Sequence, residues 1–337
     1  MGVPHGVWDA KSLEECRRIV TTLYGDGAGG ACWAVLKDNT SYLLFGFYPP
    51  TEHWRPALAA GLLVLAVVPV LTRSAPRKLL WFSAVYPFIA YVLIWGGLGL
   101  EVVSHHRFGG IMLTVLLGTI GSAAAIFVGV ALALGRMFLI LPGRALCAAI
   151  IEVFRGVPVF VVLFAGSINL TYALPPGTQV DLISWVVLVI ALCSGAHIAA
   201  AIADGLAAIP EGQRDAARAL GLSTSGAFFL VVLPQAIRSV GPRIALACAG
   251  TFRDTSLVLV VGLLDPIALS GVFRAQASWN GIFWELYLVV GLLYGLICFS
   301  VTCYAKHLQR RLDWEDANPI SALERTRTRS IALDSVS

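Results

Sequence analysis

Long apolar runs, each about as long as a lipid bilayer is thick, dominate the sequence. A helix needs ~20 mostly apolar residues to cross the hydrocarbon core. Here 58% of the 337 residues are hydrophobic and 13% are charged, against about a quarter charged in soluble domains. Candidate spans cover residues 56–71, 79–100, 111–134, 145–169, 182–202, 226–264 and 282–304. We therefore predict an all-α fold, a polytopic membrane helix bundle, with the lipid bilayer as its surroundings.

Basic residues predict the orientation of these spans, because cytoplasmic loops carry an excess of Lys and Arg. They gather in alternate loops and after the last span: Arg73, Arg77, Lys78, Arg136, Arg144, Lys306, Arg310 and Arg311. The loop 171–181 has none. We expect a cytoplasmic C-terminus and a periplasmic N-terminus, although Arg17, Arg18 and Lys37 argue weakly against the latter. The formal charge of +4 needs no nucleic-acid partner.

The spans divide the chain into a polar, glycine-rich N-terminal segment (1–54), two accessory helices (55–108), a core of the remaining spans (109–312) and a tail (313–337). Cys16 and Cys32 lie in the N-terminal segment. An oxidising compartment would permit a disulfide between them, but their spacing equally allows two free thiols. The chain has no CxxC pattern, so we expect no metal and no cofactor.

A polar stretch at 203–225 interrupts the apolar pattern. Pro210 suits a helix start, Gly221 can adopt the left-handed conformation that ends a helix, and Ser223 or Thr224 can cap a second helix. The charged residues share one face: Glu211, Arg214, Asp215 and Arg218. The apolar residues lie away from it: Ala216, Ala217 and Leu220. Such an element can insert into a groove on a cytoplasmic partner; the alternative is an ordinary amphipathic connector.

This stretch resembles the "EAA" coupling loop of ABC importer permeases. Residues 215–217 read Asp-Ala-Ala where the family has Glu-Ala-Ala, and Gly221 and the later Leu-Pro at 233–234 match the family pattern. The resemblance implies the type I ABC importer permease fold and docking of the loop on an ATPase subunit. It assigns that coupling role to Glu211, Gly212, Arg214, Asp215, Ala216, Ala217, Gly221, Leu233 and Pro234.

Other stretches are similar to permeases of polar and general L-amino-acid importers. These are residues 152–158, 210–213, 233–238 and 252–257, together with 30–34, 48–49, 54–55 and 174–177. The resemblance implies alternating access in a bacterial inner membrane, a second permease forming a heterodimer, two ATP-binding subunits and a periplasmic amino-acid-binding protein. The long permeases of this group carry one more helix before the periplasmic segment, so we expect this sequence to begin after that helix.

One stretch departs from the family pattern. Ala200 and Ala203 stand at the family's acidic and basic positions, His197 replaces a tyrosine, and Asp204 replaces a glycine. These changes imply either an altered substrate preference or a subunit that does not line a ligand site.

Polar residues within spans are functional candidates because their burial in lipid is costly. For the substrate pathway or the subunit interface they are Glu152, Arg155, Pro158, His197, Arg253, Asp254, Thr255 and Ser256. Glu152 and Arg155 can pair at i, i+3, although Arg155 could instead snorkel to the cytoplasm. Arg253 suits a substrate carboxylate, but adjacent residues point apart, so it and Asp254 need partners on other helices. His197 could be a plain packing residue.

We expect a permease subunit of an ATP-driven importer for polar or general L-amino acids. No Walker A pattern is present, so ATP hydrolysis belongs to a partner. The alternatives are a permease for another small solute and a structural subunit that supports an active partner permease. An intramembrane enzyme would need convergent catalytic groups, and the sequence has no HExxH helix.

Overall fold

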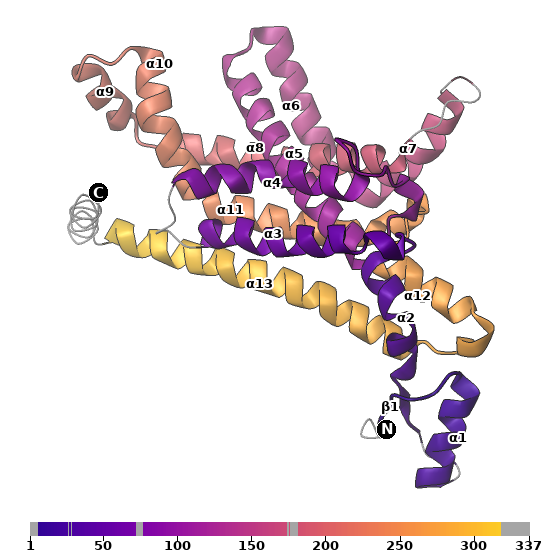
Figure 1. The fold of residues 1–337 in the computed structure, drawn as a ribbon. Coiled ribbons are helices and arrows are strands. Elements are labelled where there is room, and N and C mark those ends of the chain that lie inside the picture. Colours follow the sequence, from indigo (N-terminus) through magenta and orange to yellow (C-terminus); the bar gives the residue numbers. More distant parts are fainter. Residues whose placement is uncertain are drawn as a thin grey trace.

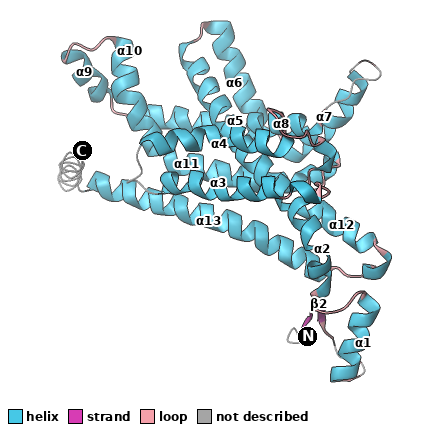
Figure 2. Cartoon of the chain, viewed as in Figure 1, coloured by secondary structure: helices cyan, strands magenta, loops and turns pink. Residues whose placement is uncertain are grey.

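The computed structural model describes residues 6–317 except 26, 28, 72–76, 174 and 176–180. Part of the predicted basic turn, including Arg73, lies outside the described residues, as do most of the arginine-free loop and the tail from 318. Apart from loops and two short strands, β1 (Gly6–Val7) and β2 (Ala31–Cys32), the described part is helical, as Figure 2 shows. The all-α prediction is confirmed.

Six helices form the main bundle: α3 (Trp54–Leu71), α4 (Arg77–Trp95), α5 (Gly110–Phe138), α8 (Leu182–Ala207), α11 (Leu233–Asp254) and α13 (Trp284–Ala317). The helix α8 is central, because it packs against both α5 and α11, while α13 covers α11 (Figure 1). The hairpin of α3 and α4 joins the bundle through α5. Glycines allow the closest approach, since a Cβ on Gly129 of α5 would lie 2.7 Å from Ile198 of α8.

Four segments are long and apolar enough to cross a membrane: Gly110–Phe138, Leu182–Ala207, Thr224–Val261 and Trp284–Arg310. They correspond to four predicted spans. The predicted span 79–100 is shorter than expected, because α4 ends at Trp95 and Gly96, Gly97 and Gly99 follow with positive φ. Its described apolar part is Trp81–Trp95.

The predicted span over 145–169 is broken near its middle. The segment forms two helices, α6 (Leu141–Gly156) and α7 (Val159–Ala173), whose axes are bent by 106°. Pro158 lies at the break and has no N–H with which to continue the helix. Both helices project from the main bundle in Figure 1.

The N-terminal segment is a packed unit. Its helices are α1 (Leu13–Tyr24) and α2 (Ala34–Phe45), and β1 pairs with β2 in parallel. Val20 and Val35 of this unit share a buried cluster with Phe273 of α12 (Pro266–Ala275) and with Trp279. Short 3₁₀ turns, Pro50–Glu52, His105–Arg107 and Ala277–Trp279, complete the connections.

The two ends of the molecule carry different elements (Figure 1). The short helices α9 (Glu211–Ala219) and α10 (Thr224–Ala227) lie at the same end of the long helices as the C-terminal end of α13. The N-terminal unit and α12 lie at the other end.

Candidate coupling helix and polar cluster

The predicted coupling segment is a helix, a sharp turn and a second helix. Pro210 caps α9 at its N-terminus. Gly221 has φ +86°, a conformation that favours glycine, and its N–H donates to the carbonyl of Arg218 at 2.9 Å. The hydroxyl of Ser223 accepts from the N–H of Gly226 at 3.1 Å. Ser223, and not Thr224, is therefore the cap of α10.

Most of α9 faces outward. Glu211, Asp215, Ala216 and Arg218 are exposed, and Leu220 just after the helix is 85% exposed. An exposed leucine beside charged residues is a suitable contact for a partner protein. Gly212 is also exposed, and Arg214 is half-buried.

Ala217 corrects the predicted docking face. Its side chain is only 3% exposed, because α9 packs against α10 and against the π-helical turn η3 (Phe228–Val232). Ala217 therefore holds α9 against its own chain and does not offer a surface to a partner. The apolar part of the outward face is formed by Ala216 and Leu220.

Leu233 and Pro234 begin α11, directly after the π-helical turn. Pro234 has no N–H to donate to the carbonyl of Leu230, four residues earlier, so the regular α pattern is interrupted here. The side chains of Gln213 and Gln235 lie 3.5 Å apart and connect α9 with α11. Two of the recognised sequence stretches therefore meet in space.

The departures from the family pattern lie in the contact between α8 and α11. Ala200 belongs to a buried cluster with Ala236 and Val240. Asp204 accepts a hydrogen bond from Arg243 at 2.8 Å. Sequence analysis missed this ion pair, because the two residues are 39 positions apart and no local pattern links them.

The polar cluster lies where α11 gives way to the 3₁₀ turn η4 (Thr255–Val261). Arg253 Nε lies 3.7 Å from Oδ1 of Asp254, so the expectation that these neighbours point apart is wrong. The hydroxyls of Thr255 and Ser256 donate to the carbonyls of Phe252 and Arg253, at 2.7 and 2.8 Å. Their hydrogens are therefore not available to a substrate, although their oxygens can still accept.

An open pocket of about 210 Å³ lies beside this cluster. Arg253 lines it with a side chain that is 74% exposed, together with Ser256, Tyr287 and Tyr294. An exposed guanidinium that lines a pocket can bind an anionic group.

His197 and the pair on α6 complete the predicted set. The ring Nδ1 of His197 donates to the carbonyl of Cys193 at 2.9 Å, within its own helix. Arg155 Nη1 lies 3.7 Å from Oε1 of Glu152, and both side chains are exposed. Within the described residues, no hydrogen bond or ion pair joins this second pair to the Arg253 cluster.

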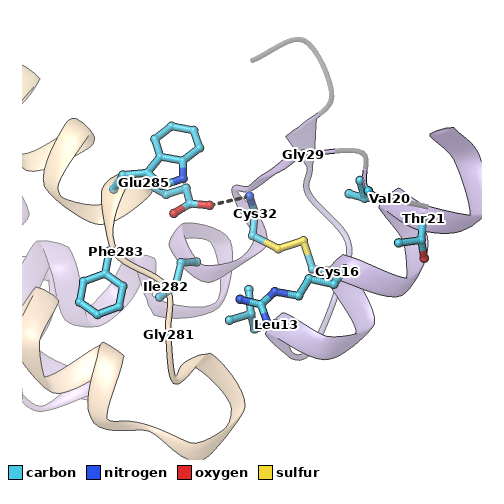
Figure 3. A pocket seen from close by; sticks show the side chains of 14 residues that line it. Leu13, Cys16, Val20, Thr21, Gly29, Cys32, Gly281, Ile282, Phe283 and Glu285 are labelled. Atoms are coloured by element: carbon cyan, nitrogen blue, oxygen red, sulfur yellow. Dashed lines mark hydrogen bonds between the residues drawn. A yellow bond between two sulfur atoms is a disulfide. The ribbon is translucent and has the colours of Figure 1, made fainter. Parts of the chain in front are cut away.

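Cys16 and Cys32 form a disulfide, with Cα atoms 6.2 Å apart. It joins α1 to β2, and the N–H of Cys32 donates to Glu285 Oε1 on α13 at 3.0 Å (Figure 3). Sequence analysis did not single out Glu285, since one acidic residue at the start of an apolar run carries no signal. The described part of the chain contains no group of His, Cys, Asp and Glu suited to a metal ion.

The chain is similar in sequence to known proteins. The family model described as "Binding-protein-dependent transport system inner membrane component" matches residues 125–314. The chain is 37% identical to the glutamate/glutamine/aspartate/asparagine transport system permease protein BztC of Rhodobacter capsulatus, over 91% of this chain and 85% of that protein. It is 33% identical to the inner membrane amino-acid ABC transporter permease protein YhdY of Escherichia coli, over 84% of this chain and 78% of that protein.

A solved structure has a similar fold. The crystal structure of an amino acid ABC transporter with histidines contains a chain that superposes with a TM-score of 0.53 at 23% identity, covering 60% of this chain and 92% of that chain. This likeness shows the predicted type I ABC importer permease fold.

Proposed function

Because the chain belongs to the family of binding-protein-dependent transport system inner membrane components, we propose that it is the permease subunit of an ATP-driven importer for polar L-amino acids. The family and the apolar helices make the chain a multi-pass inner-membrane permease, and not an enzyme. The amino-acid substrate is inferred from the relatives, two of which are named for amino-acid transport.

The observation that carries the coupling part of the proposal is the outward face of α9. Charged side chains and the exposed Leu220 are presented at one end of the long helices, on an element braced from behind by Ala217. This surface suits a groove on a cytoplasmic ATP-binding subunit, two of which would serve a pair of permeases. The N-terminal unit at the opposite end (Figure 1) would then face the periplasm and the amino-acid-binding protein, with the C-terminus in the cytoplasm.

The substrate path is assigned to the cluster around Arg253, next to a second permease subunit. Its guanidinium is exposed on the chain taken alone, as expected for a group that meets a substrate carboxylate or the partner permease. A charged side chain within a membrane-spanning segment is costly, so it is a functional candidate. No cofactor enters this function, because alternating access needs only the movement of helices.

Substitution on α9 tests the coupling. Asp215→Lys should lower ATPase activity stimulated by the binding protein, because it reverses a charge at the proposed contact. Lys306→Glu is the matched control, since Lys306 is an exposed charged residue on α13 and lies outside the proposed docking element. Unchanged stimulation in the Asp215 variant, with the complex still assembled, would refute docking through α9.

Uptake by the reconstituted complex tests the substrate. We expect polar L-amino acids to be taken up with the cognate binding protein, and Arg253→Gln to reduce uptake more than Arg253→Lys does. Uptake of another small solute, without uptake of amino acids, would favour the alternative that the chain is a permease for that solute. Normal uptake in the Arg253→Gln variant would favour a supporting role beside an active partner permease.

A further inference from the structure

An open pocket of about 500 Å³ lies between α1 and the start of α13 (Figure 3). It belongs to the end of the molecule that carries the N-terminal unit, away from α9 (Figure 1). Small-molecule sites typically enclose about 300–1,000 Å³, so the pocket is large enough for a solute. Neither the coupling helix nor the Arg253 cluster contributes to it.

One part of the pocket lining is apolar. It consists of the Cys16–Cys32 disulfide and the side chains of Leu13, Val20, Ile282, Phe283 and Trp284. Phe283 and Trp284 are about half exposed, and exposed aromatic side chains that line a concave surface favour contact with an apolar group.

Glu285 brings a carboxylate into this apolar setting. The residue is only 4% exposed, and Oε1 accepts from the N–H of Cys32. Within the described residues, Oε2 has no hydrogen-bond or ion-pair partner. Glu285 lines the pocket, so its second oxygen can accept a hydrogen bond from an ammonium group.

Arg17 supplies the opposite charge. It lies on α1, its side chain is exposed, and it lines the same pocket. An arginine can bind a carboxylate with two parallel hydrogen bonds. The pocket therefore combines one anion, one cation and an apolar surface, which are the three features of an amino acid with an apolar side chain.

We propose that this pocket binds a free L-α-amino acid with a large apolar side chain. The ammonium group lies at Glu285, the carboxylate at Arg17, and the side chain against Phe283 and Trp284. The site is separate from the substrate path and does not depend on the proposed transport function.

Hydrogen–deuterium exchange of the assembled importer in lipid nanodiscs tests the proposal, with L-leucine as the probe. Titration with L-leucine should slow exchange in residues 13–24 and 281–286. 4-Methylpentanoate lacks the ammonium group and 3-methylbutylamine lacks the carboxylate. Each should bind about tenfold more weakly or worse, because each leaves one charged side chain unpaired. The absence of protection by L-leucine at millimolar concentration would overturn the proposal.

Variants separate ligand binding from structure. Glu285→Gln keeps an oxygen for the N–H of Cys32 but removes the charge, so L-leucine should bind about tenfold more weakly while exchange without ligand stays unchanged. Arg17→Gln should have a similar effect. Arg18→Gln is the control, since Arg18 is exposed on the same helix and does not line the pocket. Equal affinity for L-leucine in all three variants would refute the site. The proposed transport function is tested separately, by the uptake of polar amino acids.

Discussion

Oδ2 of Asp204 on α8 lies 2.8 Å from Nη2 of Arg243 on α11. The pair connects the helix that leads into the coupling segment with the helix that leaves it. Both side chains are more than half exposed, at 64% and 51%, and an exposed ion pair contributes at most about 1 kcal/mol. The pair therefore adds little stability, but it links the last turn of α8 to the middle of α11.

We predict that Asp204→Asn and Arg243→Gln each lower the free energy of unfolding by no more than about 1 kcal/mol. The double variant should lose no more than the larger single loss, because both changes remove one interaction. Thermal unfolding of the four proteins in detergent measures this. Fully additive losses would show that the two side chains do not depend on each other.

Gly221→Ala should weaken coupling without disturbing the spans. The residue has φ +86°, where a side chain costs ~1–2 kcal/mol, and no atom lies within 4 Å of an added Cβ. Backbone strain in the turn is therefore the only cost of the substitution. This strain should change the position of α9 relative to α10. Transport-coupled ATPase activity is the measurement.

Gly61→Ala is the control for that experiment. Gly61 lies on α3, its added Cβ also meets nothing within 4 Å, and its φ is not positive. Alanine is favoured over glycine in a helix by about 1 kcal/mol, so stability should stay the same or rise. Coupling loss equal to that of Gly221→Ala would contradict the role of the turn.

Gly205→Ala should destabilise the contact between α8 and α11 by about 1–3 kcal/mol. The added Cβ would lie 2.4 Å from Cγ1 of Val240 and 3.2 Å from the carbonyl of Ala236. Thermal unfolding checks the prediction, with Gly241→Ala as the control because its nearest atom is 3.4 Å away, on Leu308. Adding Val240→Ala should recover part of the loss, and no recovery would place the strain elsewhere.

The stability of the chain should depend on pH through Asp265, which caps α12 between two spans. Burial raises the pKa of this carboxyl to about 6, although the N–H groups of Ala268 and Ile267 act to lower it. The folded state therefore holds the proton more tightly than the unfolded state. Stability from this group should fall as pH rises from about 4 to about 6.

Asp265→Asn should remove that dependence while keeping the helix cap, because asparagine also accepts from the first N–H groups of a helix. Unfolding temperatures of both proteins across this pH range give the comparison. Tyr294, whose hydroxyl lies 3.3 Å from Oδ2 of Asp265, stays protonated throughout it. The same slope in both proteins would assign the pH dependence to other groups.

Local chemistry made part of this structure predictable. The turn at Gly221, the cap at Ser223 and the outward charges of α9 follow from residue types within a few positions of one another. Pro158 lies at the break between α6 and α7, but a proline alone does not determine an angle of 106° between them. That angle depends on what α7 packs against, namely α8 and η4.

Contacts between distant residues were not predictable from one sequence. The sequence places Ala217 on one apolar face with Ala216 and Leu220, and only the position of η3 shows that Ala217 is covered while the other two stay exposed. The hydrogen bond between Cys32 and Glu285 joins residues 253 positions apart in the sequence. The hydrogen bond of 2.7 Å between His105 and Asp181 joins residues 76 positions apart. Periodicity carries no information about such pairs.

The π-helical turn at Phe228–Val232 affects which side of α11 faces α8. A π turn is equivalent to one extra residue in an α-helix, and each residue advances an α-helix by about 100°. Val240 and Arg243, which contact residues of α8, both follow this extra step. Deleting one residue from the turn should rotate both side chains away from α8, although the composition of the span would hardly change. The side of α11 that faces α8 therefore depends on the number of residues in the turn as well as on their chemistry.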